Sequence, residues 1–300
     1  MRLPTTETVP DGHAIDACAP LDAVAMMLDA QQAALATVRA VSAEIAQGAV
    51  LMESAVRAGR HIHYAAAGSS GLMALADACE LSGTFGLPAK AIHIHMAGGV
   101  PVDGIMPGDT EDDIAAGEQV AQQMTPGDVL IVLTASGKTP YALDIAHRAK
   151  ATGATVIGFA NNPGTPLLDM ADLPVCLATP PEVIAGSTRL GAGTAQKVAL
   201  NVMSSLMGIG LGHVFQGQMV NLVADNTKLV GRAEGIVAQI AGVPLQVAKD
   251  ALARTKGATK PAILVASGSA PEEALQLLAI HQGHLAPCFQ SLKSNQNQIV

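Results

Sequence analysis

Five short apolar segments alternate with helix-length stretches between residues 61 and 178, and this alternation limits the folds open to the chain. The strand-like segments are His61–Ala67, Ile92–Ala97, Val129–Thr134, Thr155–Ala160 and Pro174–Ala178. Strands separated by helices pair in parallel, because each helix carries the chain back across a face of the sheet. We therefore expect an α/β fold, a three-layer α-β-α sandwich around a five-stranded parallel sheet.

Helical patterns flank this predicted sheet. From Leu21 to Ala58 apolar residues recur at helical spacing, which predicts two helices before the first strand. A long helix is predicted at about Arg189–Leu211, and another begins near Asn221. Both are rich in Ala, Val, Leu and Met, so we expect subunit contacts to bury much of their surface.

The C-terminal part of the chain carries a weak two-unit repeat. One unit begins at Val243 and the other at Ser269, and each has a glycine near its middle, Gly257 and Gly283. Two short repeats predict a small helical appendage without chemistry of its own. The predicted domains are therefore residues 1–241, which hold the sheet and the N-terminal helices, and residues 242–300.

Composition argues against several classes of partner. Of the 300 residues 49% are apolar, enough for a sizeable core. Tryptophan is absent and aromatic residues make up only 2%, which disfavours stacking platforms for bases. Because the formal net charge is also −8, we do not expect nucleic acid to be a partner.

The cysteines and the lack of long apolar runs predict a cytoplasmic protein. The four cysteines are scattered without CxxC spacing, which is typical of reduced thiols: Cys18, Cys79, Cys176 and Cys288. The N-terminal residues lack a basic region followed by an apolar run, so no signal peptide is expected. Apolar stretches fall short of the roughly 20 residues that a membrane-spanning helix needs, so no membrane partner is expected.

Two short runs of glycine and hydroxyl residues each follow a predicted strand and open a predicted helix: Gly68-Ser69-Ser70-Gly71 and Ser136-Gly137-Lys138-Thr139-Pro140. Glycines let backbone N–H groups approach an anion, hydroxyls add hydrogen bonds, and the helix presents its positive end. Either run alone is also typical of an ordinary turn. Their repetition indicates a phosphate site.

The position of these runs predicts one shared pocket. Ligands of parallel sheets bind beyond the carboxyl ends of the strands, where both runs lie. The first run matches neither a P-loop nor a GxGxxG fingerprint, which favours a small phosphorylated metabolite over a nucleotide. The candidate binding residues are Gly68, Ser69, Ser70, Ser136, Gly137 and Thr139.

Two carboxylates are candidate catalytic residues. Glu80 lies about three turns into the helix after the first run, and Glu111 begins the next predicted helix. A pair of carboxylates beside a phosphosugar can divide acid and base roles. Acidic residues at helix starts also serve as caps, and Glu111 is open to that interpretation.

A further cluster at the start of the long helix contains Ser187, Arg189 and Lys197. Its basic side chains could hold an anion through charge-assisted hydrogen bonds, and they equally fit a solvated helix face.

Four histidines lie at strand spacing. His61 with His63, and His93 with His95, place two imidazoles on one face of each predicted strand. No nearby carboxylate has an evident ligand spacing, and histidines with a structural role in strands are more common than metal ligands. A metal site is therefore not expected.

Motifs along most of the chain carry a family resemblance. They include Thr5-Thr6-Glu7, Ala67–Gly71, Glu80 with Thr84-Phe85-Gly86, Ala97-Gly98-Gly99, Glu111-Asp112, Ala135–Tyr141, Asn162-Pro163, Pro181-Glu182-Val183, Gly186–Leu190, Ala192–Lys197 and Asn226–Leu229. Together they resemble a sugar isomerase (SIS) domain, and more narrowly the N-acetylmuramic acid 6-phosphate etherases, with glucokinase regulatory protein as a distant relative. The Gly186–Lys197 run is the most specific to the etherases.

The resemblance implies cleavage of the lactyl ether of N-acetylmuramic acid 6-phosphate, giving N-acetylglucosamine 6-phosphate and D-lactate in cell-wall recycling. The open-chain aldehyde acidifies the C2 proton, a base removes it, and an acid helps to expel lactate from C3 before water adds. Glu80 matches the family's acid and Glu111 its base.

The resemblance further implies phosphate binding by Ser69, Ser70, Ser136 and Thr139, a homodimer with sites near the subunit interface, and no metal or organic cofactor. Two features depart from the family pattern: Leu72 stands where an arginine is common, and residues 100–106 differ from the usual segment. They leave open a SIS-type lyase, dehydratase or isomerase acting on another amino-sugar phosphate, or a non-catalytic phosphosugar sensor.

Overall fold

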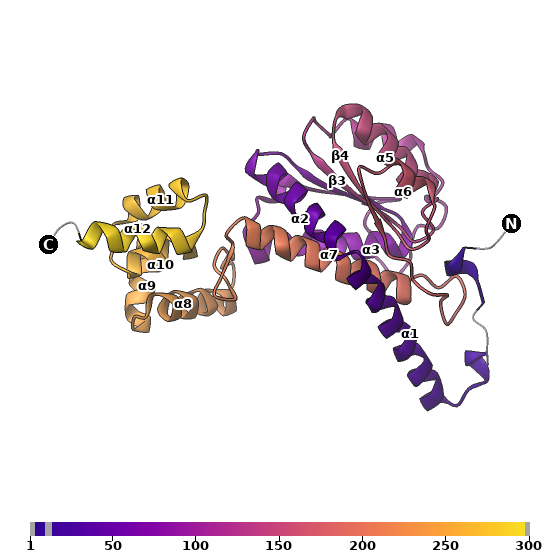
Figure 1. The fold of residues 1–300 in the computed structure, drawn as a ribbon, viewed down its shortest axis with the longest axis horizontal. Coiled ribbons are helices and arrows are strands. Elements are labelled where there is room, and N and C mark those ends of the chain that lie inside the picture. Colours follow the sequence, from indigo (N-terminus) through magenta and orange to yellow (C-terminus); the bar gives the residue numbers. More distant parts are fainter. Residues whose placement is uncertain (1–3, 10–13, 298–300) are drawn as a thin grey trace. The chain divides into compact units, whose positions relative to one another are not determined.

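A five-stranded parallel sheet is the centre of the structure, a computed structural model that describes residues 4–9 and 14–297 (Figure 1). The strand order is β2-β1-β3-β4-β5. The strands are β1 (Ile62–Ala66), β2 (Ile92–Met96), β3 (Val129–Thr134), β4 (Thr155–Ala160) and β5 (Leu173–Cys176), with a short antiparallel pair of β6 (Val214–Phe215) and β7 (Gln218–Met219). All five predicted strands are therefore confirmed.

The helices occupy the segments between and around these strands. They are α1 (Pro20–Ala40), α2 (Ser42–Arg57), α3 (Gly68–Phe85), α4 (Ala115–Ala121), α5 (Pro140–Thr152), α6 (Pro166–Met170), α7 (Gly191–Gly210), α8 (Thr227–Ala241), α9 (Leu245–Arg254), α10 (Thr259–Ala266), α11 (Pro271–Ile280) and α12 (Leu285–Asn297), with 3-10 turns at Thr5–Glu7, Ile15–Ala17 and Ala89–Ala91. The two predicted N-terminal helices are α1 and α2.

Helices cover both faces of the sheet, and β1 and β3 are buried along their whole length. One face buries Ala65, Leu130 and Val156 together with Ile145 of α5 and Leu167 of α6. On the other face lie α2, the first part of α3 and α7, and Figure 1 shows β3 and β4 between these layers. The predicted three-layer sandwich is confirmed.

The C-terminal helices follow the predicted repeat. The helix pairs α9–α10 and α11–α12 each turn through a glycine in the left-handed region, Gly257 with φ +83° and Gly283 with φ +85°. Only glycine adopts this backbone conformation without strain, which is why each unit carries one between its helices.

Contacts divide the chain into two compact units. One holds the described residues up to Ala78 with Lys90–Ser205, and the other holds Cys79–Ala89 with the described residues from Leu206 onward. The helix α8, which lies before the predicted boundary at residue 242, belongs to the second unit because Ala233 and Val237 are buried with the helices after it. Separate domains at 1–241 and 242–300 stay a prediction.

The structure also describes the state of the cysteines and the length of the apolar helices. The four cysteines are free in the structure. Within the described ranges, no single helix is long and apolar enough to cross a membrane, and only two bent helix pairs, α1 with α2 and α8 with α9, have the necessary length and composition when each pair is taken together.

A buried aspartate connects β1 to two helices. Asp77 of α3 is 3% exposed and accepts hydrogen bonds from Tyr64 Oη at 2.9 Å, Asn201 Nδ2 at 2.8 Å and Ser204 Oγ at 2.9 Å. Burial, followed by the charge and hydrogen bond of Asp77, raises the pKa of Tyr64 well above its usual value. The tyrosine therefore stays protonated and donates to the carboxylate.

Replacing this acceptor should destabilise the fold. We expect Asp77→Ala to lower the free energy of unfolding by about 3 kcal/mol, because it removes the acceptor of three side-chain donors, of which those of Tyr64 and Ser204 are buried. Tyr64→Phe removes one donor and should cost about 1 kcal/mol. Urea denaturation measures both, with exposed Asp16→Ala as the control. An Asp77→Ala protein as stable as this control would contradict the assignment.

Candidate active site

A cavity of about 260 Å³ opens at the carboxyl ends of β1 and β3. Its walls come from the N-terminal segment, both glycine and hydroxyl runs, the turn before α4 and the loop before α7. The lining residues are Thr6, Glu7, Ala67, Ser69, Ser70, Glu111, Thr134, Ala135, Ser136, Thr139, Gly186 and Thr188. The two runs singled out in the sequence thus face one cavity.

The first run forms the start of α3. Gly68 begins the helix with φ +53°, and the N–H of Gly71 donates to the Ala67 carbonyl at 3.0 Å. The first N–H groups of a helix have no acceptor within it, and the helix dipole is positive there. Because Ser69 and Ser70 lie in this first turn and line the cavity, the turn can bind an anion.

The second run is ordered by its own hydroxyls. The Oγ1 of Thr134, at the end of β3, lies 2.7 Å from Thr139 Oγ1 and 3.2 Å from Ser136 Oγ. Ser136 Oγ also accepts from the Lys138 N–H at 3.2 Å. Gly137 has φ +70°, and a Cβ there would overlap the neighbouring Thr165 side chain, so the turn requires glycine. The hydroxyls are therefore fixed before a ligand arrives.

Glu111 lies in a turn, and the prediction that it begins a helix is wrong. The helix α4 begins at Ala115, because Asp113 Oδ1 accepts from the N–H groups of Ala115 at 3.0 Å and Ala116 at 3.3 Å. The Glu111 carbonyl accepts from the Tyr141 N–H at 3.0 Å, which holds the turn against α5. Since Asp113 makes these capping contacts, the Glu111 carboxylate is left for the cavity.

The Glu111 carboxylate lies directly over the first turn of α3. Its Oε1 is 2.7 Å from the position that a Cβ would occupy on Gly68. A glycine at residue 68 therefore gives the carboxylate room beside the anion-binding turn. This contact joins the candidate base to the candidate phosphate site.

The N-terminal segment contributes a wall that the site prediction missed. The N–H and Oγ1 of Thr5 both donate to Asn162 Oδ1 at 2.8 Å, and the Gly186 N–H donates to the Thr6 carbonyl at 2.8 Å. These bonds bring Glu7 to the cavity. In the sequence only the family resemblance points to Thr5-Thr6-Glu7, although its hydroxyls and carboxylate are groups that could have indicated a site.

The loop before α7 is anchored by a buried glutamate. Glu182 is 3% exposed, and its two carboxylate oxygens each accept at 2.8 Å, Oε2 from Gly191 N and Oε1 from Ala192 N. An acidic cap of this kind satisfies the N–H groups at the helix start. It holds the loop that carries Thr188 into the cavity.

The remaining predicted residues lie outside the lining. Ser187 is half-buried, while Arg189 and Lys197 are exposed. Glu80 is exposed on the part of α3 that belongs to the second compact unit. Among the described residues that line the cavity there is no lysine or arginine, so the donors facing a phosphate are hydroxyls and backbone N–H groups.

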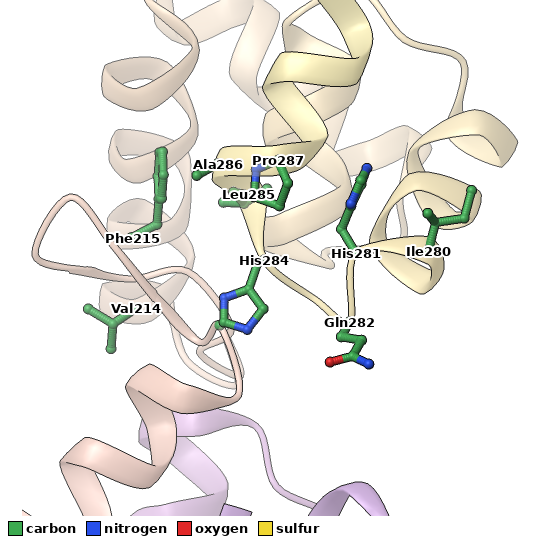
Figure 2. A pocket seen from close by; sticks show the side chains of 10 residues that line it. Val214, Phe215, Ile280, His281, Gln282, His284, Leu285, Ala286 and Pro287 are labelled. Carbon is green, nitrogen blue, oxygen red and sulfur yellow. The ribbon is translucent and has the colours of Figure 1, made fainter.

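A second hollow, of about 320 Å³, lies within the C-terminal unit (Figure 2). Figure 2 shows its labelled side chains coming from β6, from the end of α11, from the start of α12 and from the turn between these two helices. His281 Nε2 is already 2.9 Å from Ser291 Oγ. This hollow contains none of the candidate residues, so the cavity beside the sheet is the candidate active site.

Comparison with known proteins decides the family. The SIS domain model matches residues 28–161. A Deinococcus radiodurans protein named N-acetylmuramic acid 6-phosphate etherase is 41% identical over 287 residues, 93% of each chain. The chain belongs to the N-acetylmuramic acid 6-phosphate etherase family. A Yersinia pestis etherase of the same name is 37% identical over 256 residues, 83% of this chain and 85% of the relative.

The fold of this etherase family member is also found among solved structures. An Escherichia coli protein whose structure has been solved superposes with a TM-score of 0.50 at 18% identity, covering 67% of this chain and 97% of that one. This likeness concerns the fold alone. The SIS fold and the etherase membership expected from the sequence are confirmed.

A double-mutant cycle tests the contact between Glu111 and Gly68. We expect Gly68→Ala to destabilise the protein more than Gly59→Ala does, since Gly59 has a similar φ of +68° but open space around its Cβ position. In a protein that also carries Glu111→Ala, Gly68→Ala should destabilise no more than Gly59→Ala does. The difference between the two backgrounds is the coupling energy, which we expect to be roughly 0.5–3 kcal/mol in the free energy of unfolding. Strictly additive effects in chemical denaturation would show that the carboxylate does not press on Gly68.

Proposed function

We propose that the chain is a carbon–oxygen lyase that cleaves the D-lactyl ether of N-acetylmuramic acid 6-phosphate, giving N-acetylglucosamine 6-phosphate and D-lactate in cell-wall recycling. Membership of the etherase family across 93% of the chain supports this reaction. The observation that carries the mechanism is the Glu111 carboxylate over the first turn of α3, in a cavity lined by hydroxyls.

The 6-phosphate is held by neutral donors. The hydroxyls of Ser69, Ser70, Ser136 and Thr139 line the cavity, and the first turn of α3 adds N–H groups and the positive end of its dipole. Fixed donors of this kind need little reorganisation when the anion arrives, because the second run is already ordered by its own hydrogen bonds. The phosphate would thereby position C2 and C3 near Glu111.

The reaction requires a base, an acid and water. Glu111 takes the C2 proton of the open-chain sugar, and the electron pair forms the C2–C3 double bond as the C3–O bond breaks. Glu80, which lies outside the described lining, is assigned the acid's role by the family resemblance and gives its proton to the departing lactate oxygen. Water then adds at C3 and a proton returns to C2, so that one substrate and one water give the two products. General acid–base groups contribute roughly 10²- to 10⁴-fold each.

Turnover in oxygen-18 water tests the reaction itself. We expect purified protein to release D-lactate from N-acetylmuramic acid 6-phosphate and to place the label at C3 of the sugar, because water adds to the unsaturated intermediate. Mass spectrometry follows both products. Unlabelled sugar would contradict elimination and hydration, and binding without turnover would indicate a phosphosugar sensor.

Variants of the two glutamates should separate the removal of the C2 proton from the protonation of the departing lactate. Glu111→Gln is expected to abolish both lactate release and the exchange of the C2 proton with deuterated water. Glu80→Gln should slow lactate release by roughly 10²- to 10⁴-fold yet retain C2 exchange, because its role follows proton removal. NMR measures exchange and an enzymatic assay measures lactate. Glu7→Gln, which changes the other carboxylate of the cavity, is the matched comparison.

A SIS-type lyase, dehydratase or isomerase for another amino-sugar phosphate is the second candidate. Leu72, which replaces a common arginine, is 36% exposed on α3 and is not among the cavity residues, and Val102 in the divergent segment 100–106 is 99% exposed. Neither feature alters the described lining. Comparing turnover with and without the 3-O-lactyl group separates the two candidates.

We further propose a cytoplasmic homodimer. An apolar stripe on α1 supports the pairing of two copies of the chain. Leu21 is 80% exposed, and Val24, Leu28 and Leu35 follow on the same side of the helix with exposed fractions of 45–58%. Such a stripe on a helix of a stable protein is typical of a covered surface. Light scattering of the purified protein measures the mass that decides between one copy and two.

A further inference from the structure

Three histidines gather at the amino ends of β1 and β2, the edge opposite to the cavity, and the fourth, His95, lies farther along β2. His61 directly precedes β1, and His63 lies in β1. His93 lies in β2 and is paired with His63 in the strand register. One ring nitrogen from each of these three side chains lies within 4.8 Å of the other two. The strand pairing therefore brings three imidazoles to one point.

Each of the three rings has a buried nitrogen without a short hydrogen bond. Within the part of the chain that the structure describes, His61 Nδ1, His63 Nε2 and His93 Nε2 are buried and have no hydrogen-bond partner. Leaving a buried polar atom unsatisfied costs about 1–3 kcal/mol. Three such atoms facing one another are explained together if one cation accepts all three lone pairs.

A buried carboxylate lies beside two of the three histidines. Asp128, which precedes β3, is fully buried, and its oxygens lie 3.5 Å from His61 Nδ1 and 3.5 Å from His63 Nε2. It accepts from His61 N at 2.8 Å and from Thr125 N at 2.7 Å. Both of its oxygens are therefore held in place by backbone N–H groups.

Hydrogen bonds from outside the cluster orient the rings of His63 and His93, as is common for histidines that bind a metal. His63 Nδ1 lies 3.0 Å from His95 Nε2, and His93 has a hydrogen bond to the backbone of Lys90. Such outer partners fix the orientation of a ligand ring and leave its other nitrogen for the metal.

We propose that His61, His63, His93 and Asp128 form a zinc site that joins the amino ends of β1, β2 and β3. Three imidazole nitrogens and one carboxylate oxygen are a tetrahedral donor set suited to Zn²⁺. Zinc–nitrogen bonds of about 2.0–2.1 Å require the rings to draw together on binding. His61 and His93 are both partly exposed, which gives the ion a route from solvent.

The site is structural. It lies at the end of β1 opposite to Ser69 and Ser70, roughly 20 Å away at the rise of an extended strand. The sequence did not indicate this site because its carboxylate comes from a distant segment, and only the pairing of β1 with β3 brings Asp128 beside His61. Binding would stabilise the β2 edge of the sheet without taking part in ether cleavage.

Zinc binding by the purified protein tests this inference. We expect chelator-treated wild-type chain, dialysed against micromolar ZnCl2, to hold one zinc per chain by elemental analysis, with a higher Tm than the zinc-free protein. His93→Gln and His61→Gln should each lose the bound zinc and the Tm increase. The matched control is His147→Gln, which changes an exposed histidine on α5 and should behave as wild type.

Two further measurements sharpen the outcome. His95→Gln, which alters only an outer partner, should weaken zinc binding by roughly 10- to 100-fold. Circular dichroism verifies that each variant is folded, and turnover of the ether should be unchanged in the folded variants. A wild-type chain that holds no zinc, or equal zinc in the wild-type, His61→Gln and His93→Gln proteins, would overturn the proposal.

Discussion

Parallel pairing of the five strands constrains everything else in the structure, because it places every strand-to-helix loop at one edge of the sheet. The loops after β1 and β3 meet there although they are far apart in the chain. The same constraint places the start of α3 at the cavity. Asp77 then holds this helix to β1 and to α7 through three buried hydrogen bonds. The anion-binding turn is therefore positioned by the core of the protein.

The cavity combines two opposing electrostatic demands within a small volume. A phosphate needs positive potential, and a proton-abstracting carboxylate is itself negative. The structure meets both demands with neutral donors and a helix dipole, and with a glycine at residue 68 that lets Glu111 lie over the same turn. In the proposed complex the phosphate holds the sugar while the carboxylate faces the carbon chain.

Each edge of the sheet has its own chemistry. The carboxyl edge carries glycine, hydroxyl and carboxylate groups on loops, which suit a transient small ligand. The amino edge carries imidazoles of β1 and β2 beside Asp128, which precedes β3, and these are the groups of the proposed zinc site. Because the two edges are separated by the length of a strand, a change in one need not disturb the other.

Local patterns in the sequence determined the strands, the flanking helices, the two phosphate-type runs and the C-terminal repeat, because periodicity, glycine position and hydroxyl content act over a few residues. Tertiary structure decided what those patterns could not. Asp113 rather than Glu111 makes the capping contacts of α4, Asn162 brings Thr5 and so Glu7 to the cavity, and Asp128 joins the histidines. Each of the last two contacts joins segments far apart in the chain, and sequence spacing does not encode which distant side chains meet.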